Sequence, residues 1–501
     1  MKAKKPKAQE FERTPVPNES LLGFKSFIGM YAGEHCAGTE LMIGPLFIAA
    51  GVSAFDVVWG LIVGNALAVL SWMFMCAPIA TRARLTLYYQ LEKICGRKLV
   101  TLYNLANGVM FCFLAGAMIT VSATAIGVWF DFPMPGLNDL FPNSVGWVLA
   151  VAAVGIVIAI VAAFGYQIVA RFANIAAPWM VLVFLAFGLI GLRQFIDATD
   201  TTVRSLSDVW SLAQTEIWRG GDPQPGRVKF TFWHVTFFAW FTNMAMHIGM
   251  SDLSVLRYAR KSWYSISSAA GMYVGHFMAW LSASILYAYQ LHGDPAHTDV
   301  LPGPMAFQAA GLAGLLCVII AGWTTANPTI YRAGLAFQAI MPKRSRFVVT
   351  LATGLVATMA GMFPAIAMRL LDFVAFYGLL LMPMGAIIFI DFWLIRKFGL
   401  HSSFAEKSGR AFNWAAGLAW LVTLTVCTIM VQFSNIMDWL TGRGTVTLSP
   451  ERLEWFKQTF TIEIFFVSLP GWFLTAVLYI VLSKFYQTKL RPTVAGGTEN
   501  A

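Results

Sequence analysis

Long apolar stretches recur along the whole chain and constrain its fold more than any other feature. A helix that crosses the hydrocarbon core of a bilayer, about 30 Å thick, needs about 20 predominantly apolar residues. Twelve stretches meet that requirement: about 26–51, 55–79, 102–129, 145–165, 169–192, 230–250, 265–290, 305–338, 346–366, 370–395, 412–433 and 461–484. We therefore expect an all-α membrane protein with twelve transmembrane helices.

The placement of charge agrees with a membrane protein. Only 12% of the residues are charged, about half the share in soluble domains. The net charge of +10 could suggest a nucleic-acid partner, but most of the 35 Lys and Arg residues fall in the N-terminal tail and in loops on one side of the membrane. This is the distribution of the positive-inside rule. We expect both termini in the cytoplasm, a plasma (inner) membrane location and no nucleic-acid partner.

The apolar stretches divide the chain into one membrane domain with short tails. We expect cytoplasmic tails at residues 1–25 and 485–501, a ten-helix transport core at 26–395, and helices 11 and 12 within 396–484. The first twenty residues are polar and basic, which predicts no cleavable signal peptide. The sequence carries neither a P-loop signature for ATP-driven transport nor a Cys/His spacing typical of a metal site.

Two of the expected spans contain polar residues that an ordinary membrane helix avoids. The first contains GMYAGEHCAGTELMIG, in which Glu34, His35 and Glu40 lie among four glycines, and the sixth contains Asn243 and His247. An ionisable group at the bilayer centre costs about 2.5–3.5 kcal/mol on insertion scales. Spans 1 and 6 occupy matching places if the first ten spans form two halves of five. We therefore expect a five-plus-five inverted repeat with broken helices 1 and 6, which in transporters surround a midplane site.

The eighth span contains the sequence AGWTTANPTIYRAGLAF. In it Ala321, Thr324 and Thr325, called the oxygen face below, lie on one side of a helix. One carbonyl and two hydroxyls supply half of the oxygen cage that a small hard cation needs, and carbonyls freed by the break in span 1 could supply the rest. The alternative is that both threonines bond back to the preceding turn, as they often do in membrane helices.

The same segment resembles the nucleobase–cation symporter family, the cytosine, purine and hydantoin permeases. The resemblance rests on WTTANPTIYRAGLAF in span 8, VWGLIVGNALAVL in span 2 and SVLRYAR after span 6. It implies a leucine-transporter-like inverted repeat and sodium bound at the oxygen face. Where the family commonly has Asn after WTT, this chain has Ala326, and Asn327 follows.

Aromatic and polar side chains of spans 3 and 6 suit a flat nitrogenous solute. Trp240, Asn243 and His247 recur at i, i+3 and i+7, and they combine a stacking surface with hydrogen-bonding groups. The resemblance implies that Trp240 stacks on the base. It also aligns Phe111 with a second stacking residue, with Ala115 facing the site one turn on. The alternative for Trp240 is a packing or interfacial role among 18 tryptophans.

The ionisable residues of span 1 allow two roles. Glu34 and His35 could contact the substrate, and a buried carboxylate suits proton coupling. The alternative for Glu34 is an ion pair with His or Arg that holds the bundle together. The candidate substrate-binding residues are Glu34, His35, Gly38, Phe111, Ala115, Trp240, Asn243, His247 and Asn327, with Glu40 less clearly placed. Arg369, Asp372 and Asp391 are expected to be structural or near an interface.

Together these features predict a secondary active transporter and no enzyme. It would import a nucleobase or a related solute of the cytosine, purine, hydantoin or allantoin class by alternating access, with sodium or a proton as coupling ion and no other cofactor. The first alternative is an amino-acid or amine transporter of the same fold, which Glu34 disfavours because it would repel a substrate carboxylate. The second is a membrane receptor or enzyme, which predicts a sizeable extramembrane domain or a nucleophile–base pair, and the sequence displays neither.

Overall fold

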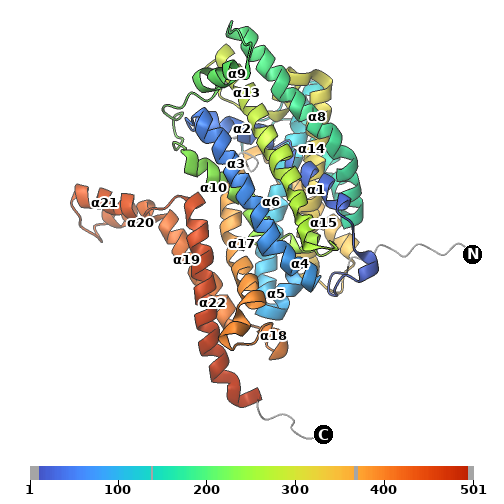
Figure 1. Cartoon of the computed structure of the whole chain (residues 1–501), viewed down its shortest axis with the longest axis vertical. Coiled ribbons are helices and arrows are strands. Elements are labelled where there is room, and N and C mark those ends of the chain that lie inside the picture. The colour runs from blue at the N-terminus through green and yellow to red at the C-terminus, as the bar shows by residue number, and fades with distance from the viewer. Residues whose placement is uncertain (1–10, 137–138, 366–369, 495–501) are drawn as a thin grey trace, which may run out of the picture.

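The computed structural model describes residues 11–136, 139–365 and 370–494, and most of them belong to helices that run roughly along one axis (Figure 1). Apart from two isolated bridges, the described residues contain no β-structure. Eight of the described helices are long and apolar enough to cross a membrane. The all-α, multi-pass membrane class is therefore confirmed, whereas the count of twelve spans and the inverted repeat stay predictions.

The helices follow the apolar stretches closely. In the first half they are α1 (Lys25–His35), α2 (Glu40–Ala49), α3 (Ala54–Ser71), α4 (Ala77–Ala83), α5 (Leu87–Cys95), α6 (Arg97–Phe130), α7 (Val145–Ala163), α8 (Tyr166–Ala198) and α9 (Leu206–Leu212). The second half contains α10 (Phe232–Phe241), α11 (Met244–His247), α12 (Leu253–Leu256), α13 (Met278–Gly293), α14 (Pro302–Ile340), α15 (Arg346–Gly361), α17 (Leu370–Trp393), α18 (Phe404–Lys407), α19 (Trp414–Val431), α20 (Phe433–Gly442), α21 (Pro450–Phe460) and α22 (Ile464–Val494).

The first span is broken where the sequence predicts an interruption. Helix α1 ends at His35, and α2 begins at Glu40 after the connection Cys36–Thr39. Gly38 lies in this connection, close to α6, where an added Cβ would come within 2.6 Å of Val121. An acidic first residue favours a helix start, because it lies at the positive end of the helix dipole.

The sixth span is also interrupted. Helix α10 ends at Phe241, Asn243 precedes the short α11, and a turn with a positive φ of 66° at Met250 follows. The expectation that Trp240 and His247 share one continuous helical face is therefore wrong. The break brings them together instead, with the Nε2 atom of His247 3.1 Å from the carbonyl oxygen of Trp240.

Three stretches of the described residues have the wide turn of a π-helix: Trp72–Cys76 between α3 and α4, Ala213–Ile217 after α9, and Ala270–Phe277 before α13. Such turns are rare and frequently occur at functional sites. The last stretch packs against α1, because Gly275 and Gly271 present no side chain to His35. A Cβ at Gly275 would lie 2.7 Å from the Cβ of His35.

The long helix α14 changes direction near its start. Ala310 and Gly311 have non-helical backbone angles, so a short first segment precedes the membrane-crossing part. Beyond the kink, α14 packs along α6 and also contacts α8 and α15. The oxygen face of α14 thus lies within the bundle, where α1 also reaches it.

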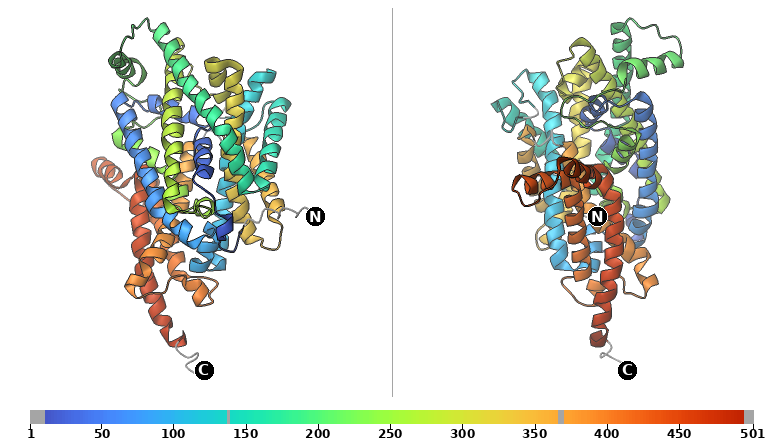
Figure 2. Two further views of the ribbon diagram at one scale, coloured as in Figure 1. Left: turned by 45° about the vertical axis from the view of Figure 1, so that its right-hand side comes forward. Right: turned by 90° about the vertical axis from the view of Figure 1, so that its left-hand side faces the viewer.

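The last helices form a separate layer on one side of the bundle. Helices α19 and α22 pack on each other and on α17, while α20 and α21 project as an arm (Figures 1 and 2). Asp391 of α17 accepts hydrogen bonds from the Tyr479 hydroxyl of α22 and the Ser403 amide, which suits the structural role expected for it. Arg369 lies outside the described residues, and of Asp372 the structure describes only the backbone, within α17.

Candidate functional site

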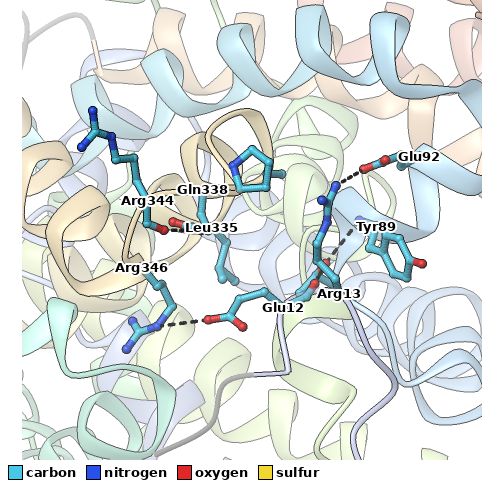
Figure 3. Close-up of a pocket in the computed structure, with 11 residues that line it drawn as sticks. Glu12, Arg13, Tyr89, Glu92, Leu335, Gln338, Arg344 and Arg346 are labelled. Carbon is cyan, nitrogen blue, oxygen red and sulfur yellow. Dashed lines mark hydrogen bonds and ion pairs between the residues drawn. The ribbon is translucent and has the colours of Figure 1, made fainter. Parts of the chain in front are cut away.

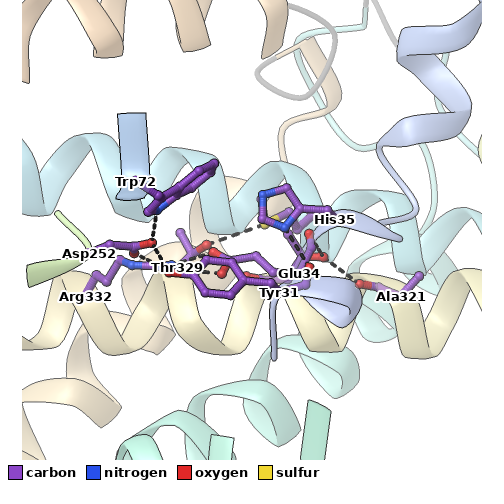
Figure 4. Close-up of polar contacts among 10 residues, drawn as sticks. Tyr31, Glu34, His35, Trp72, Asp252, Ala321, Thr329 and Arg332 are labelled. Atoms are coloured by element: carbon purple, nitrogen blue, oxygen red, sulfur yellow. Dashed lines mark hydrogen bonds and ion pairs between the residues drawn. The ribbon is translucent and has the colours of Figure 1, made fainter. Parts of the chain in front are cut away.

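A chain of buried charges joins spans 1, 6 and 8 at the centre of the bundle (Figure 4). Arg332 of α14 contacts the carboxylate of Glu34 through Nη1 at 2.5 Å and through Nη2 at 3.3 Å. The same Nη2 lies 2.7 Å from the carboxylate of Asp252. The side chains of Arg332 and Asp252 are 0% exposed and that of Glu34 is 7% exposed. This is the ion-pair alternative for Glu34, and its contact with a substrate stays a prediction.

Two aromatic side chains complete this network. The second oxygen of Asp252 accepts hydrogen bonds from the Tyr31 hydroxyl at 2.8 Å and from the Trp72 indole at 2.7 Å. We call Tyr31, Glu34, Trp72, Asp252 and Arg332 the ion network. The charged groups of the ion network are hydrogen-bonded on several sides. These bonds offset part of the free-energy cost of removing the charges from water.

The oxygen face lies directly beside the ion network. The Thr324 hydroxyl is 2.8 Å from the Gly33 carbonyl and 2.9 Å from the Ala321 carbonyl. The Thr325 hydroxyl is 3.3 Å from the Glu34 carbonyl and 2.9 Å from that of Ala321. The back-bonding alternative is thus present, yet the same hydroxyls also reach the end of α1. Five oxygen atoms from two helices converge there, and sodium binding by them stays a prediction.

Two buried imidazoles flank Trp72 at the breaks. Nδ1 of His35 lies 2.7 Å from the Tyr31 carbonyl, and Nε2 of His247 lies 3.1 Å from the Trp240 carbonyl. A carbonyl only accepts, so each ring donates that bond, and in a neutral ring the other nitrogen is an acceptor. Those nitrogens, Nε2 of His35 and Nδ1 of His247, are buried and have no hydrogen-bond partner among the described residues. The ring centroids of His35 and His247 lie 6.1 Å and 4.5 Å from that of Trp72.

Trp240 and Asn243 lie at the same break with different surroundings. The Trp240 ring stacks on Phe241 with centroids 4.6 Å apart, and its indole N–H donates to Ser71 at 2.9 Å. These are the contacts of a packed tryptophan, and its stacking on a solute stays a prediction. The Asn243 side chain is half-buried, and its amide nitrogen lies 4.0 Å from the sulfur of Met272. Sulfur is a weak acceptor, so the amide can still form stronger hydrogen bonds with other groups.

The remaining candidates are buried in the long central helices. Phe111 and Ala115 are fully buried in α6. Asn327 of α14 is 1% exposed, and both atoms of its amide have no hydrogen-bond partner among the described residues. An unsatisfied buried amide costs about 1–3 kcal/mol, so Asn327 fits a place where a water or a ligand binds. Roles of these three residues at a substrate site stay predictions.

A second buried acid lies on the other side of the break in span 1. The carboxylate of Glu40 accepts a hydrogen bond from the Trp280 indole and lies 3.6 Å from Nε2 of His276. The His276 ring stacks on Trp280 at 4.3 Å and meets the His35 ring edge-on at 4.6 Å. We call Glu40, His276 and Trp280 the acid–imidazole cluster.

Reasoning from the sequence missed several of these residues. It placed no role on Trp72, His276 or Trp280, which are single residues in spans with no repeated polar pattern. Arg332 was part of the span 8 motif but was not assigned as the partner of Glu34, which lies 298 positions away. Its signal was available, because an arginine within a membrane span requires a counter-charge.

Two cavities lie at the ends of the bundle, away from the breaks. One, of about 240 Å³, is lined by the N-terminal segment, α5 and the end of α14 (Figure 3). There Arg13 pairs with Glu92 at 2.7 Å, and Arg346 lies 3.6 Å from Glu12. The other, of about 280 Å³, lies where the end of α2 meets residues 216–224. Neither cavity is lined by a residue of the ion network.

Comparison with known proteins identifies the fold. No protein-family model and no curated sequence matches this chain. Solved structures do match: the chain has the fold of membrane transporters, among them a nucleobase-cation-symport-1 family transporter and a Na+-coupled sialic acid symporter.

The particular likeness is to Mhp1, a nucleobase-cation-symport-1 family transporter. Its closed form with bromovinylhydantoin bound has a TM-score of 0.67 at 15% identity, covering 97% of this chain and 96% of that one. Its inward-facing form has a TM-score of 0.57 at 16% identity, covering 95% and 96%. A substrate-bound, Na+-coupled sialic acid symporter has a TM-score of 0.52 at 14% identity, covering 92% and 95%. The fold is therefore that of the family which the sequence resembles.

Proposed function

We propose that this protein is a cation-coupled secondary transporter that carries a flat heterocycle rich in N–H groups, such as a nucleobase or a hydantoin. The single observation that carries the proposal is the pair of imidazole acceptors beside Trp72, which have no hydrogen-bond partner among the described residues. Each lies at a break in a span, where backbone groups are also free of helical bonding. The fold supports the transporter class, and the substrate is our inference from these acceptors.

The acceptors favour a donor on the substrate. A buried acceptor without a partner costs free energy, and a ring N–H that supplies the missing bond recovers it. Uracil-like, purine and hydantoin rings present several N–H groups in one plane, and the two acceptors beside Trp72 offer partners for them. Such rings would also stack on an aromatic surface. The bound bromovinylhydantoin in Mhp1 supports the same chemical class.

A cation bound at the oxygen face would couple transport to a gradient. Its oxygens come from α1 and α14, two helices that contact each other at the break. A hard cation such as Na+ prefers carbonyl and hydroxyl ligands. Binding of a cation would fix the end of α1 against α14 and so favour one orientation of the broken span 1.

A second candidate substrate is a carboxylate-bearing solute such as an amino acid. The objection from Glu34 loses force because Arg332 pairs with that carboxylate. The sialic acid symporter with this fold carries such a solute. The imidazole acceptors nevertheless offer no donor to a carboxylate while both rings are neutral, so the heterocycle ranks first.

Uptake into proteoliposomes tests the two substrates directly. A panel of unlabelled nucleobases, hydantoins and amino acids competes with each radiolabelled member in turn. We expect heterocycles with ring N–H groups to be transported and amino acids to have no effect. Transport of amino acids alone would refute the heterocycle proposal.

A variant of His247 tests the observation itself. His247→Phe keeps the ring and removes the acceptor, so affinity for the transported heterocycle should fall about tenfold or more, equivalent to about 1.4 kcal/mol. The matched control is His297→Phe, because His297 is exposed on the loop after α13. Equal affinity in both variants would contradict the proposed role of the acceptors.

A further inference from the structure

The acid–imidazole cluster differs from the ion network because it contains no guanidinium. Among the described residues, no Lys or Arg contacts the carboxylate of Glu40, whose polar neighbours are the Trp280 indole and His276. Glu40 and His276 are 5% and 4% exposed at the side chain. Two elements of the surroundings offset part of a negative charge: the donated indole N–H, and the positive end of α2, which begins at Glu40.

A buried carboxylate without a full counter-charge binds a proton readily. Burial of an isolated charge is so costly that such groups neutralise instead. One proton added to this pair removes the imbalance, either on the carboxylate or on the imidazole. Nδ1 of His276 is also buried and unpartnered among the described residues, so the pair has a second position that can hold or pass on a proton.

The cluster lies across parts of the fold that meet at the break. Glu40 begins α2, His276 belongs to the π-helical stretch before α13, and the edge of His276 touches His35 at the end of α1. A change in the angle between α1 and α2 therefore changes the distance between Glu40 and His276. Proton affinity at this position is linked to the conformation of the broken span.

We propose that Glu40 and His276 form a proton-binding site that takes up and releases one proton in each transport cycle. The proton comes from water on one side of the membrane, forms an O–H or N–H bond in the pair, and leaves to water on the other side. No oxidation or reduction occurs. The proposal rests on the proposed transport function and is separate from the oxygen face, with which the pair shares no residue.

Other titratable groups face the pair from the surrounding elements. His35 faces His276 from α1, and the Cys36 thiol faces Glu40 from the connection. Cys317 of α14 lies beyond Cys36. On the far side of His35 the charges belong to the ion network, where Arg332 pairs with both Glu34 and Asp252. Glu40 is therefore the acid at this break that has no arginine partner among the described residues.

Infrared difference spectroscopy tests proton binding without any substrate. Purified full-length protein in lipid vesicles is titrated with acid, and the carbonyl stretch of protonated carboxylic acids is followed. We expect a band that appears well above about pH 4, where exposed carboxylates titrate, and that is lost in Glu40→Gln but kept in the exposed control Glu454→Gln. In His276→Phe the midpoint should move by about one pH unit to higher pH, because the carboxylate loses its polar neighbour. An unchanged band in Glu40→Gln would overturn the proposal.

Uptake then tests coupling. Wild-type vesicles should accumulate radiolabelled solute when a pH gradient is imposed, whereas Glu40→Gln should exchange solute but not accumulate it. Gradient-driven accumulation in Glu40→Gln would overturn the coupling role. A band lost in Glu40→Gln together with no uptake of any solute by the wild type would refute the transport function while supporting the proton site, so the two failures are distinguishable. Should Glu40→Gln fail to fold, the His276→Phe midpoint decides, and an unmoved midpoint overturns the proposal.

Discussion

Two glutamates lie on either side of the same break, six residues apart, in opposite electrostatic settings. Glu34 ends up against Arg332, which also binds Asp252, so two carboxylates share one guanidinium. Glu40 lies against an indole and an imidazole instead. Both side chains are almost fully buried, and neither burial nor sequence neighbourhood distinguishes them.

The difference teaches that the partner decides what a buried acid can do. Removal of the arginine from such a pair leaves a buried carboxylate without a counter-charge. A carboxylate beside imidazole can lose its charge by taking a proton, so its removal strands nothing. Glu34 therefore belongs to the interactions that hold spans 1, 6 and 8 together, whereas Glu40 is free to change protonation state.

The largest effect should come from removing the shared cation. Arg332→Met leaves Glu34 and Asp252 buried without a counter-charge and should lower the free energy of unfolding by about 3–5 kcal/mol. Thermal unfolding of the purified protein measures it. Arg344→Met is the matched control, because Arg344 is exposed beyond the end of α14. Equal melting temperatures of the two variants would contradict the role of Arg332 as the counter-charge of Glu34 and Asp252.

The two glutamine variants compare the acids directly. Glu34→Gln leaves Arg332 with Asp252 alone and should cost about 1–3 kcal/mol in the free energy of unfolding. Glu40→Gln removes no partner of a cation and should change it by less than about 1 kcal/mol near neutral pH. The same thermal unfolding assay reports both. Greater loss of stability in Glu40→Gln than in Glu34→Gln would reverse the assignment of the two roles.

The oxygen face beside Glu34 should show a smaller effect that depends on sodium. Thr325→Ala removes hydrogen bonds to two carbonyls and should cost about 1 kcal/mol. Sodium should raise the melting temperature of the wild type by mass action, and this response should shrink in the variant. Thr329→Ala is the matched control, because the Thr329 hydroxyl bonds one turn back along α14, at Thr325, and not across to α1. A sodium response that survives in Thr325→Ala, or is absent in the wild type, contradicts the sodium site.

The smallest effect concerns the indole beside Glu40. Trp280→Phe keeps an aromatic ring against His276 but removes the N–H that Glu40 accepts. The free energy of unfolding should change by less than about 1 kcal/mol. The indole hydrogen bond favours the ionised carboxylate, so its loss should move the pH profile of uptake to higher pH. Uptake measured across pH in both proteins checks this. A profile that moves to lower pH would show that the indole does not stabilise the charged form.

Local pattern was enough to predict the breaks and the oxygen face. Glycine and polar residues inside an apolar run mark a helix that cannot continue through lipid, and the spacing of Ala321, Thr324 and Thr325 fixes a shared side of a helix. Both signals are contained in a few consecutive residues. The helices of the structure begin and end near the limits of the apolar stretches for the same reason.

Long-range pairing could not be predicted in the same way. Glu34 offered the choice between substrate and ion pair, and the answer depends on Arg332, which reaches it from another helix. Trp72 and His276 carry no local pattern, and each lies in a wide turn that shifts the helical period. A prediction from α-helical periodicity therefore places residues beyond such a turn on the wrong side of the helix.

The wide turn at Ala270–Phe277 has a consequence for how this chain tolerates insertions and deletions. A π-turn holds one residue more than an α-turn over the same length of axis. Deletion of one residue there would restore an ordinary α-helix while the segments on either side keep their orientation, because the wide turn absorbs the extra residue. The span would still cross the membrane, but His276 lies inside the turn, so its direction toward Glu40 would change. Deletion of a single residue in this stretch thus changes the proposed proton-binding site more than it changes the fold.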